Sequence, residues 1–378
     1  MMKILHIIDS SNLYGAEIML LNLIEEQRRS GLIPVLCNIG VSKKAENSID
    51  EEAIKRGIKI INIKFKRGFD IINALKLWKE AIFIKTDIIH SHSYKSDIIY
   101  GVIPKYFRKL PMIATLHGLT DTRRYYKLNI YDSLACMTYR YIDALVLVDK
   151  SMLHNKKLLN IRHCNIHVIE NGIEEMNSNI LNGGLDINNA YRNTSDIIIG
   201  AIGRLNYEKG YHVLIEAINV LVKNGKNIKL IIIGDGPERE RLKRIIIKYR
   251  LIDNIFLVGY KIYAKKHLRE FDAFVMPSFR EGLPITILEA MQAGVPIIAT
   301  DVGGIPEMLQ YGKAGIIIKP NNIQLLVDAI NNVLDNNKMR ENIVNNARNI
   351  VKEIYSSDVM ARKYTCLYNN VLANHILQ

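Results

Sequence analysis

The chain has 378 residues, which is too many for one ordinary hydrophobic core, so we expect two domains. Its composition, 48% hydrophobic and 24% charged, is typical of soluble globular proteins, and its formal charge of +13 favours anionic partners: a nucleoside diphosphate, an acidic membrane surface or nucleic acid. The four cysteines have no disulfide or metal-ligand spacing and no apolar run approaches about 18 residues, so we expect a cytoplasmic protein without a zinc site, signal peptide or membrane span.

Short apolar strands alternate with helix-length segments along the chain, a pattern that predicts parallel α/β layers. In the first half we predict strands at Lys3–Ile8, Ile33–Ile39, Lys59–Ile63, Ile88–Ser91, Met112–Leu116, Ala144–Leu147 and His167–Ile169. In the second half we predict strands at Ile197–Ile202, Lys229–Gly234, Ile255–Leu257, Ala273–Met276, Pro296–Ala299 and Gly315–Ile318. Residues 177–196, rich in Asn, Gly and Ser, predict a hinge between a domain of residues 1–176 and one of residues 197–355, and residues 356–378 predict a final helix.

Three strand ends in the first half carry candidate site residues. Gly15 precedes a predicted helix, so its backbone can approach a phosphate. His117 lies just past a predicted strand, where it can hydrogen-bond the transferred sugar and help to stabilise positive charge through an oriented backbone. A turn histidine with satisfied hydrogen bonds is the alternative interpretation. His90 and His92 point the same way on a strand, but a metal needs a third ligand and none is visible. We therefore expect these two histidines to line the side of a site where an acceptor enters.

Two basic, aromatic stretches also lie in the first half, "PKYFRKL" at residues 104–110 and "TRRYYKL" at residues 122–128. Lysine and arginine mixed with tyrosine and phenylalanine are typical of a surface that rests on anionic lipid. Ordinary solvated helix faces have a similar composition, so both interpretations stay open.

The loop after the first strand of the second half, "GRLNYEKG", holds two cations. Gly203 turns the chain, and Arg204 and Lys209 are five residues apart beside a helix start. Two cations there neutralise a diphosphate and offset the charge that grows on a leaving group. In "IIIGDGPERERL", Gly234 is expected to turn the chain tightly at the floor of the same site. The chain has no Asp-x-Asp pair to hold a diphosphate through a divalent ion, so we predict that no metal and no cofactor is needed.

The segment "REGLPITILEAMQAGVPIIAT" places Glu281 and Glu289 eight positions apart around a turn that opens a helix at a proline. The backbone N–H groups of Gly282, Leu283 and Ile285 then converge at the positive end of the helix dipole, where phosphate binds. Two carboxylates beside that phosphate would repel it unless they face hydroxyl groups. The pattern therefore predicts a nucleotide-sugar site, with Glu289 on the ribose and Glu281 on the transferred sugar.

These motifs together resemble retaining glycosyltransferases of family 4, the glycosyl transferases group 1 type, and the resemblance extends from Ile4 to the final helix. It is most specific in "GRLNYEKG", "IIGDGPERERL", "VGY" and "MPSFREGLPITILEAMQAGVPIIATDVGGIPEML", where Glu-x7-Glu is the family signature. In the first half, "YGAE", "IIHSHSYKSD", "TLHGL" and "VIENGI" are similar to its strand-end motifs. One departure is Glu170, an acidic residue that stands next to Asn171 where proline is more usual.

The resemblance implies a GT-B fold: two doubly wound Rossmann-like α/β domains facing a central cleft, with the final helix packed back on the first domain. It implies that Glu281 and His117 contact the donor sugar as catalytic residues. It also assigns residues to the diphosphate (Gly15, Arg204, Lys209, Gly282, Leu283, Ile285), to the ribose and base (Glu289, Gly259, Tyr260), and to the cleft in general (Gly203, Gly234, Asn171, His92).

The function that follows is metal-independent transfer, with retained configuration, of a hexose-type sugar from a nucleoside diphosphate sugar to an acceptor hydroxyl. We expect a UDP-sugar as donor and a lipid-linked glycan of bacterial surface polysaccharide (O-antigen or capsule) as acceptor, at the inner face of the membrane. A nucleotide-sugar 2-epimerase of the same fold and a non-catalytic nucleotide-sugar scaffold are the alternatives. Nucleic-acid binding rests on the +13 charge alone, and because the cations are spread over both halves we do not expect it.

Overall fold

The structure is a computed structural model that describes residues 1–10, 13, 15–40, 49–63, 65–66, 70–117, 133–154, 158, 165–175, 196–261 and 264–376. The predicted hinge, apart from Asp196, and the basic stretch of residues 122–128 lie outside the described residues. The chain divides into two compact units: Met1–Glu174 together with Ser357–Gln378, and Glu175–Ser356.

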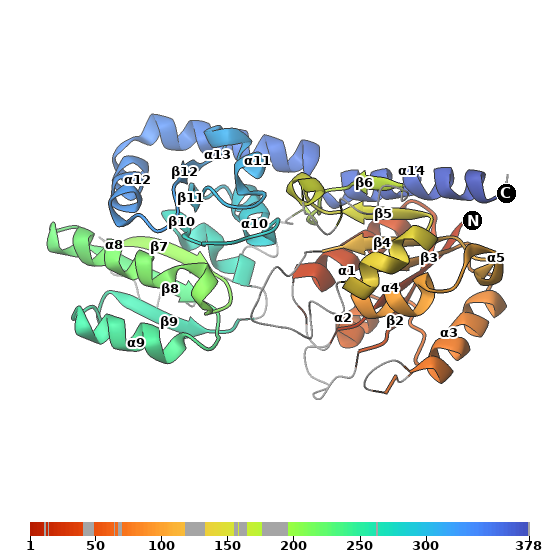
Figure 1. Ribbon diagram of the computed structural model, residues 1–378. Helices are drawn as coiled ribbons and strands as arrows, with labels where there is room; N and C mark the ends of the chain where they lie inside the picture. Colours follow the sequence, from red (N-terminus) through yellow and green to blue (C-terminus); the bar gives the residue numbers. More distant parts are fainter. Residues whose placement is uncertain are drawn as a thin grey trace. The chain divides into compact units, whose positions relative to one another are not determined.

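The first unit is built on a six-stranded parallel sheet in the order β2-β1-β3-β4-β5-β6 (Figure 1). Its strands are β1 (Lys3–Ile8), β2 (Ile33–Asn38), β3 (Ile88–Ser91), β4 (Met112–Leu116), β5 (Ala144–Leu147) and β6 (Ile166–Val168). Its helices are α1 (Gly15–Arg29), α2 (Ile49–Lys55), α3 (Ile71–Phe83), α4 (Tyr94–Gly101), α5 (Lys105–Arg108) and α14 (Ser357–Ile376), with short 3-10 turns at Tyr139–Tyr141 and Lys150–His154.

The strand predicted at Lys59–Ile63 is wrong. That segment meets the edge of the sheet only through Ile60, in an isolated bridge to Leu36 of β2. Its two hydrogen bonds run from Leu36 N–H to Lys59 O (2.9 Å) and from Ile61 N–H to Leu36 O (2.8 Å). The segment has the apolar residues of a strand, but it pairs with β2 at one residue only and so does not form a strand of the sheet.

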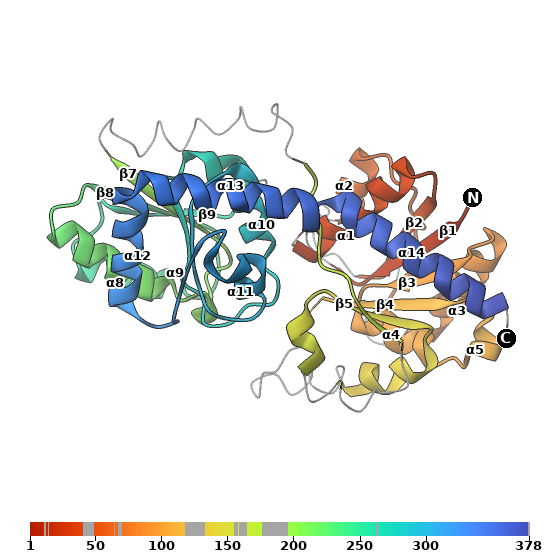
Figure 2. The same cartoon turned by 90° about the horizontal axis from the view of Figure 1, so that it is seen from above.

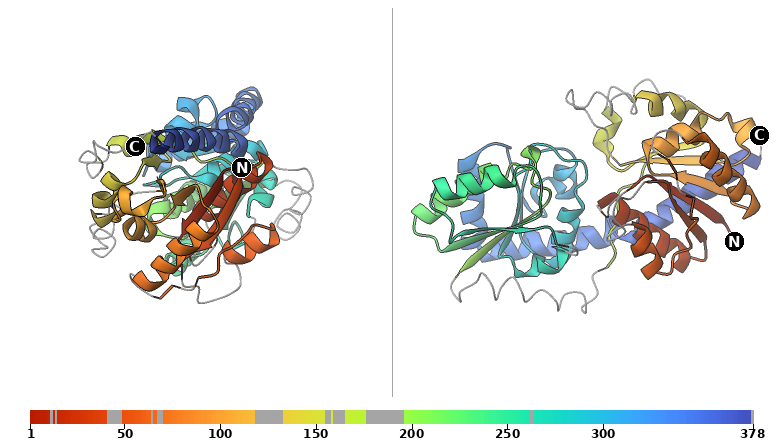
Figure 3. Two further views of the ribbon diagram at one scale, coloured as in Figure 1. Left: turned by 90° about the vertical axis from the view of Figure 1, so that its right-hand side faces the viewer. Right: turned by 90° about the horizontal axis from the view of Figure 1, so that it is seen from below.

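The two faces of the first sheet differ because successive side chains of a strand point to opposite sides. Leu5 and Ile7 belong to the core that also contains Leu77 of α3 and Tyr100 of α4. His6 points to the other side, where α14 runs along α1 (Figure 2 and Figure 3).

The second unit has its own six-stranded parallel sheet in the order β12-β11-β10-β7-β8-β9. Its strands are β7 (Ile197–Ile202), β8 (Ile228–Ile233), β9 (Ile255–Gly259), β10 (Ala273–Met276), β11 (Ile297–Thr300) and β12 (Ile316–Ile318). Its helices are α8 (Tyr211–Lys223), α9 (Arg239–Lys248), α10 (Ile285–Ala293), α11 (Ile305–Met308), α12 (Ile323–Asp335) and α13 (Asn337–Ile354), with 3-10 segments η4 (Tyr207–Lys209), η5 (Ala264–Glu270) and η6 (Gln310–Gly312).

Each sheet has one point at which the strand order reverses. In the first unit this point lies between β1 and β3, and in the second unit it lies between β7 and β10. Open parallel sheets bind ligands outside the carboxyl ends of the strands at such a point. The loops that follow β1, β3, β7 and β10 are therefore the places to look for a site.

Within the described part of the chain, no helix combines the length and the apolar character needed to cross a membrane.

Candidate functional site

The floor of the candidate site in the second unit is a close contact between two loop backbones. A Cβ atom added to Gly234 would lie 1.9 Å from the carbonyl oxygen of Gly203, and one added to Gly203 would lie 2.6 Å from the Tyr211 hydroxyl. Gly203 N–H also donates to Ile233 O at 3.0 Å. Only glycine fits at position 234, where the close neighbour is backbone, so the loops after β7 and β8 are in direct contact.

Lys209 and Glu281 come together in this unit. Lys209 ends η4, and the next residue, Gly210, is left-handed (φ +66°) and so close to β10 that a Cβ atom would lie 2.1 Å from Pro277 O. The Lys209 Nζ atom donates to Glu281 Oε1 at 2.6 Å, and the Ser278 hydroxyl donates to the same oxygen, also at 2.6 Å. The carboxylate is therefore neutralised and oriented at the switch point of the sheet.

The turn after Glu281 leads into α10, whose N-cap position is Pro284 and carries no side-chain cap. The first N–H groups of a helix have no acceptor within it, so Ile285 presents such a donor here. A second loop supports this turn from below: Gly304 N–H donates to Gly282 O at 3.0 Å. Gly303 (φ +56°) approaches so closely that a Cβ atom would lie 2.0 Å from Glu281 O. The supporting role of these glycines was not predicted, although "DVGG" after a strand is a signal of close backbone approach.

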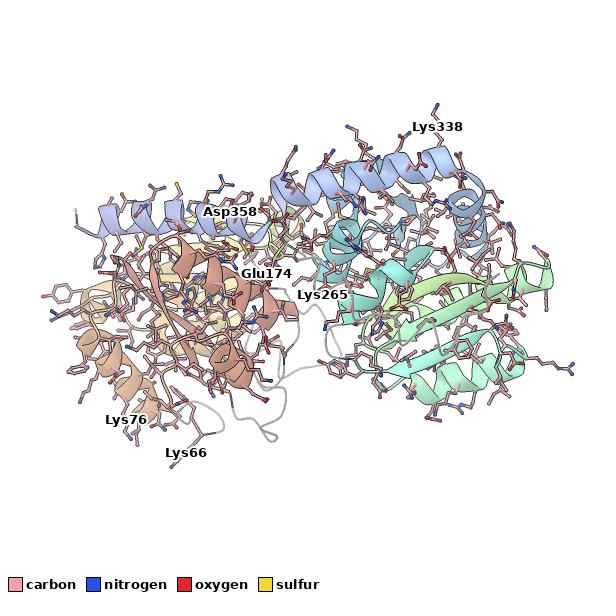
Figure 4. All side chains as sticks on the ribbon, turned by 180° about the vertical axis from the view of Figure 1, so that it is seen from behind. Lys66, Lys76, Glu174, Lys265, Lys338 and Asp358 are labelled. Carbon is pink, nitrogen blue, oxygen red and sulfur yellow. The ribbon has the colours of Figure 1, made fainter. Side chains whose placement is uncertain are left out.

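Glu289 lies one turn into α10 and is partly buried. Burial raises the pKa of its carboxyl group to about 7, and the Lys265 ammonium on η5 opposes that rise. Figure 4 labels Lys265 on this segment. Glu289 thus titrates close to neutral pH, which is unusual for a carboxyl group and typical of functional positions.

The remaining predicted residues of the second unit lie around this floor. Gly259 ends β9 with a left-handed φ of +87°, and its carbonyl accepts a hydrogen bond from Gly234 N–H at 2.9 Å. The Tyr260 side chain that follows is exposed. Arg204 is exposed too, and among the described residues its side chain forms no ion pair. Arg239 was missed by the sequence analysis; it donates to Leu257 O at 2.9 Å and braces the end of β9.

In the first unit, the predicted residues lie at the carboxyl ends of the parallel strands. Gly15 is the first residue of α1 after β1, His92 follows β3 and His117 follows β4. His92 Nδ1 and His117 Nε2 are 3.3 Å apart, so the two rings are in contact. Both His92 and His90 are buried, and His90 is 0% exposed. The prediction that these two histidines line an acceptor surface is therefore wrong for His90, which faces α14.

Asn171 is buried in the segment that follows β6. The neighbouring Glu170, which departs from the expected proline, accepts a bond of 2.6 Å from Lys363 Nζ on α14. A charge pair within the first unit therefore accounts for this acidic residue.

The basic stretch of residues 104–110 is only partly a surface. Arg108 is fully buried: it pairs with Asp143 Oδ2 at 2.9 Å and donates to the carbonyls of Leu110, Tyr100, Ile103 and Tyr141. Arg108 therefore takes no part in a surface of either kind that the sequence left open, because an arginine with this many acceptors holds the surrounding backbone together. Tyr106 and Phe107, in contrast, are exposed, at 84% and 66%.

Comparison with known proteins identifies two matching families. Residues 14–175 match glycosyltransferase family 4, and residues 186–350 match glycosyl transferases group 1. The uncharacterized glycosyltransferase MJ1607 of Methanocaldococcus jannaschii is 30% identical over 298 residues, which cover 75% of each chain. The O-antigen biosynthesis glycosyltransferase WclY of Escherichia coli is 25% identical over 382 residues, 98% of this chain and 99% of that one.

Among solved structures, Anabaena HepE in complex with UDP superposes with a TM-score of 0.81 at 18% identity, over 98% of this chain and 100% of that chain. This similarity shows that the fold, with its two six-stranded parallel α/β sheets, is of the GT-B type. The predicted fold class is confirmed.

Proposed function

Since the chain belongs to glycosyltransferase family 4, we propose that it transfers a hexose-type sugar from a UDP-sugar to an acceptor hydroxyl with retention of configuration. The observation that carries this proposal is the cluster of Lys209, Glu281, Ser278 and the start of α10 at the switch point of the second sheet. HepE, whose fold the chain shares, has been solved with UDP and with UDP-glucose, which supports the choice of donor.

The diphosphate would lie against the N-terminus of α10, between the turn at Gly282–Ile285 and the cations Arg204 and Lys209. The helix dipole and the two positive charges favour an anion there and offset the charge that develops on the leaving group. In the transfer, the bond from the anomeric carbon to the diphosphate oxygen breaks and the bond to the acceptor oxygen forms on the same face. The acceptor hydroxyl gives its proton to the departing phosphate oxygen, so the enzyme needs neither its own nucleophile nor a metal ion.

Glu281 would hold the donor sugar by accepting hydrogen bonds from its hydroxyl groups. Its pairing with Lys209 removes the repulsion that a bare carboxylate would exert on the neighbouring phosphate. Glu289 would accept from the ribose hydroxyls, and the backbone around Gly259 and Tyr260 would contact the base. For the first unit, we propose that Gly15, Asn171 and His117 contact substrate, with His92 beside His117.

We propose that the acceptor is a lipid-linked glycan, in line with the O-antigen relative. The described surface of the first unit supports this. Helix α3 exposes an apolar row, and α5 adds an exposed tyrosine and phenylalanine; the row consists of Ile71, Ile72, Leu75, Ile82, Phe83, Tyr106 and Phe107. The two helices are tied by a bond of 3.2 Å from Trp78 Nε1 to Arg108 O.

Five exposed lysines lie on these helices or close to them along the chain: Lys66, Lys76, Lys79, Lys85 and Lys109. Figure 4 shows Lys66 and Lys76 extending outward at the edge of the first unit. Apolar side chains together with lysines fit the interface of an anionic membrane, which they would contact peripherally.

The first experiment is a thermal-shift panel with UDP, GDP, ADP and TDP and their sugar conjugates, in excess EDTA. We expect a shift for UDP and its sugars, followed by transfer to acceptor that survives EDTA. Loss of transfer in EDTA would contradict the metal-independent mechanism. A donor converted to its epimer without acceptor would support the epimerase, and tight binding without turnover would support the scaffold.

The membrane contact is tested separately by sedimentation with anionic and neutral vesicles. We expect the protein to sediment with the anionic vesicles and an Ile72→Ser/Phe83→Ser variant to stay in solution. Ile247→Ser, an exposed isoleucine of α9 in the second unit, is the matched control and should sediment like the wild type. Equal binding to both kinds of vesicle would contradict the proposal.

A further inference from the structure

A chain of hydrogen bonds runs from His117 into the core of the first unit. His117 Nε2 meets His92 Nδ1 at 3.3 Å, His92 Nε2 meets His6 Nδ1 at 3.0 Å, and His6 Nε2 meets Gln27 Oε1 at 2.8 Å. Gln27 Nε2 then donates to the Tyr368 hydroxyl of α14 at 3.1 Å. His6 within β1, the residues that follow β3 and β4, and two helices thus share one polar network on the covered face of the sheet.

The network continues on the same face. The Tyr368 hydroxyl meets His90 Nδ1 at 2.7 Å, and His90 Nε2 meets Thr115 Oγ1 at 2.7 Å. Thr115 Oγ1 and the Tyr364 hydroxyl are 2.9 Å apart. The rings of His6, His90 and His92 are close enough to ligate a metal ion, since their nearest nitrogen atoms all lie within 4.8 Å of one another. Every nitrogen atom of these three rings, however, already has a hydrogen-bond partner.

The direction of each bond follows from its acceptor at Gln27. Gln27 Oε1 can only accept, so His6 Nε2 carries the proton and His6 Nδ1 is the bare nitrogen. His92 must then donate from Nε2, which leaves His92 Nδ1 to accept from His117 Nε2. Each of these imidazoles is neutral, because burial lowers the pKa of His6 and of His117 to about 4 and that of His92 well below its usual range. The remaining nitrogen, His117 Nδ1, is therefore a lone-pair acceptor.

Among the residues that the structure describes, this nitrogen is the one ring nitrogen of the network without a hydrogen-bond partner. His117 Nδ1 is buried, and among the described residues it has no hydrogen-bond partner. A buried acceptor without a partner costs about 1–3 kcal/mol, so a donor is expected to reach it. It lies at the carboxyl end of β4, on the edge of the sheet where ligands bind.

We propose that His6, His92 and Gln27 lock His117 in its Nε2–H tautomer, so that His117 Nδ1 accepts a hydrogen bond from a hydroxyl group of the donor sugar or of the acceptor. This inference rests on the proposed function. His117 is the residue that touches substrate, and the other three are positioning residues that act through it.

The direct test is the tautomer of each ring, read by long-range proton–nitrogen NMR of protein with 15N-labelled histidine, with His117→Asn to assign the signals. We expect the Nε2–H form for His117, His92 and His6 at neutral pH. An Nδ1–H form of His117 would overturn the inference, and so would one equivalent of tightly bound transition metal that is lost in His6→Gln. This result does not depend on activity, so it stands apart from the nucleotide panel that tests the proposed function.

Ligand addition then identifies the partner of His117 Nδ1. A change in its nitrogen signal on adding donor sugar nucleotide alone assigns the hydroxyl to the donor. A change that appears only when acceptor is added assigns it to the acceptor. No change with either, in protein that binds nucleotide, would overturn the inference.

Two substitutions at His92 separate positioning from packing. His92→Gln keeps one acceptor for His117 and one donor for His6, whereas His92→Leu has neither. We expect mixed tautomers of His117 and an about tenfold loss of kcat/KM in His92→Leu, the upper end for one neutral hydrogen bond, with both largely restored in His92→Gln. His167→Leu in β6 controls for the loss of a histidine from the same unit. Equal losses in the Gln and Leu variants would contradict positioning.

Discussion

At the scale of single residues, the pairing of Glu281 with Lys209 and Ser278 is the most informative contact. Because both bonds end on one carboxylate oxygen, the side chain is fixed before any ligand arrives. Such preorganised groups contribute most to catalysis, since they need no rearrangement as charge develops. The pairing also joins the loops that follow the neighbouring strands β7 and β10. The positions of Lys209 and Glu281 therefore depend on each other.

Removing the Glu281 carboxylate should reduce turnover. We expect Glu281→Ala to lower kcat by roughly tenfold or more, since it removes the proposed contacts to the sugar and releases Lys209. The measurement is initial-rate kinetics with the donor found in the nucleotide panel. Glu341→Ala, an exposed glutamate of α13, should keep the wild-type rate. A near wild-type kcat in Glu281→Ala would refute the assignment.

Donor affinity should depend on pH through Glu289. Its pKa of about 7 means that ionisation rises from a minor to a major fraction between pH 6 and pH 8. If the carboxylate accepts from the ribose, binding should tighten roughly tenfold over that range. The affinity can be measured by titration calorimetry with a sugar nucleotide, because the diphosphate of such a compound does not titrate between pH 6 and pH 8. The affinity of Glu289→Gln should be flat with pH, and an unchanged slope in that variant would exclude Glu289 as the cause.

Sequence motifs predicted the local structure around the candidate residues of the second unit better than the side-chain contacts of the first unit. Gly203, Lys209, Glu281 and Glu289 belong to short motifs in which spacing itself encodes a strand end, a tight turn and a helix start. His6, Gln27 and Tyr368 have no such spacing. They are joined only because α14 packs against α1, a contact between segments far apart in the chain that local pattern does not predict.

At the scale of elements, the fold was predictable where apolar runs were short and flanked by polar residues. Strands β1, β3, β4, β5, β7 and β10 begin and end at the predicted residues. The segment at Lys59–Ile63 has the same composition but forms only a bridge, because whether an edge segment pairs depends on the path of the chain. Likewise, the basic composition of "PKYFRKL" did not predict that the Arg108 side chain is buried.

Arg108 should therefore be a stability residue of α5. Arg108→Met leaves Asp143 without its buried partner and several carbonyls without a donor. We expect a loss of about 3–5 kcal/mol in the free energy of unfolding. Urea denaturation measures it, with exposed Arg140→Met as the matched control that should change stability by less than about 0.5 kcal/mol. A small loss in Arg108→Met would mean that Lys105, which also pairs with Asp143, takes over the contact.

At the scale of the whole molecule, each unit folds around its own sheet and its own buried ionisable groups. In the first unit, burial lowers the pKa of His6, His90, His92 and His117, whereas it raises the pKa of Asp97 to about 7. Burial also lowers the pKa of His167 and raises the pKa of Glu25 and Asp50 in this unit. The histidines and the carboxyl groups thus act in opposite directions on the pH dependence of stability, and the five histidines outnumber the three carboxyl groups.

The first unit should lose stability in mild acid. A histidine whose pKa falls on folding contributes its full stability above about pH 6.5 and loses it as pH falls, by roughly 1.4 kcal/mol per pH unit for each group. Asp97 offsets part of this loss, since its raised pKa favours the folded state below pH 7. Trp78, the single tryptophan of the chain, lies on α3 and reports on this unit by fluorescence. A urea midpoint that stays the same or increases when the pH is lowered from 7.5 to 5 would contradict the neutral histidine network.

The place of α14 has a consequence for how the protein is made. This helix belongs to the first unit, yet the ribosome synthesises it only after the entire second unit. Until then, Gln27 and His90 lack Tyr368, and the polar face of the first sheet stays uncovered. Domains usually fold in the order of synthesis. Here the second unit can complete its core before the first unit, which still lacks α14. Until α14 packs, the histidines that it covers in the folded protein are exposed to water.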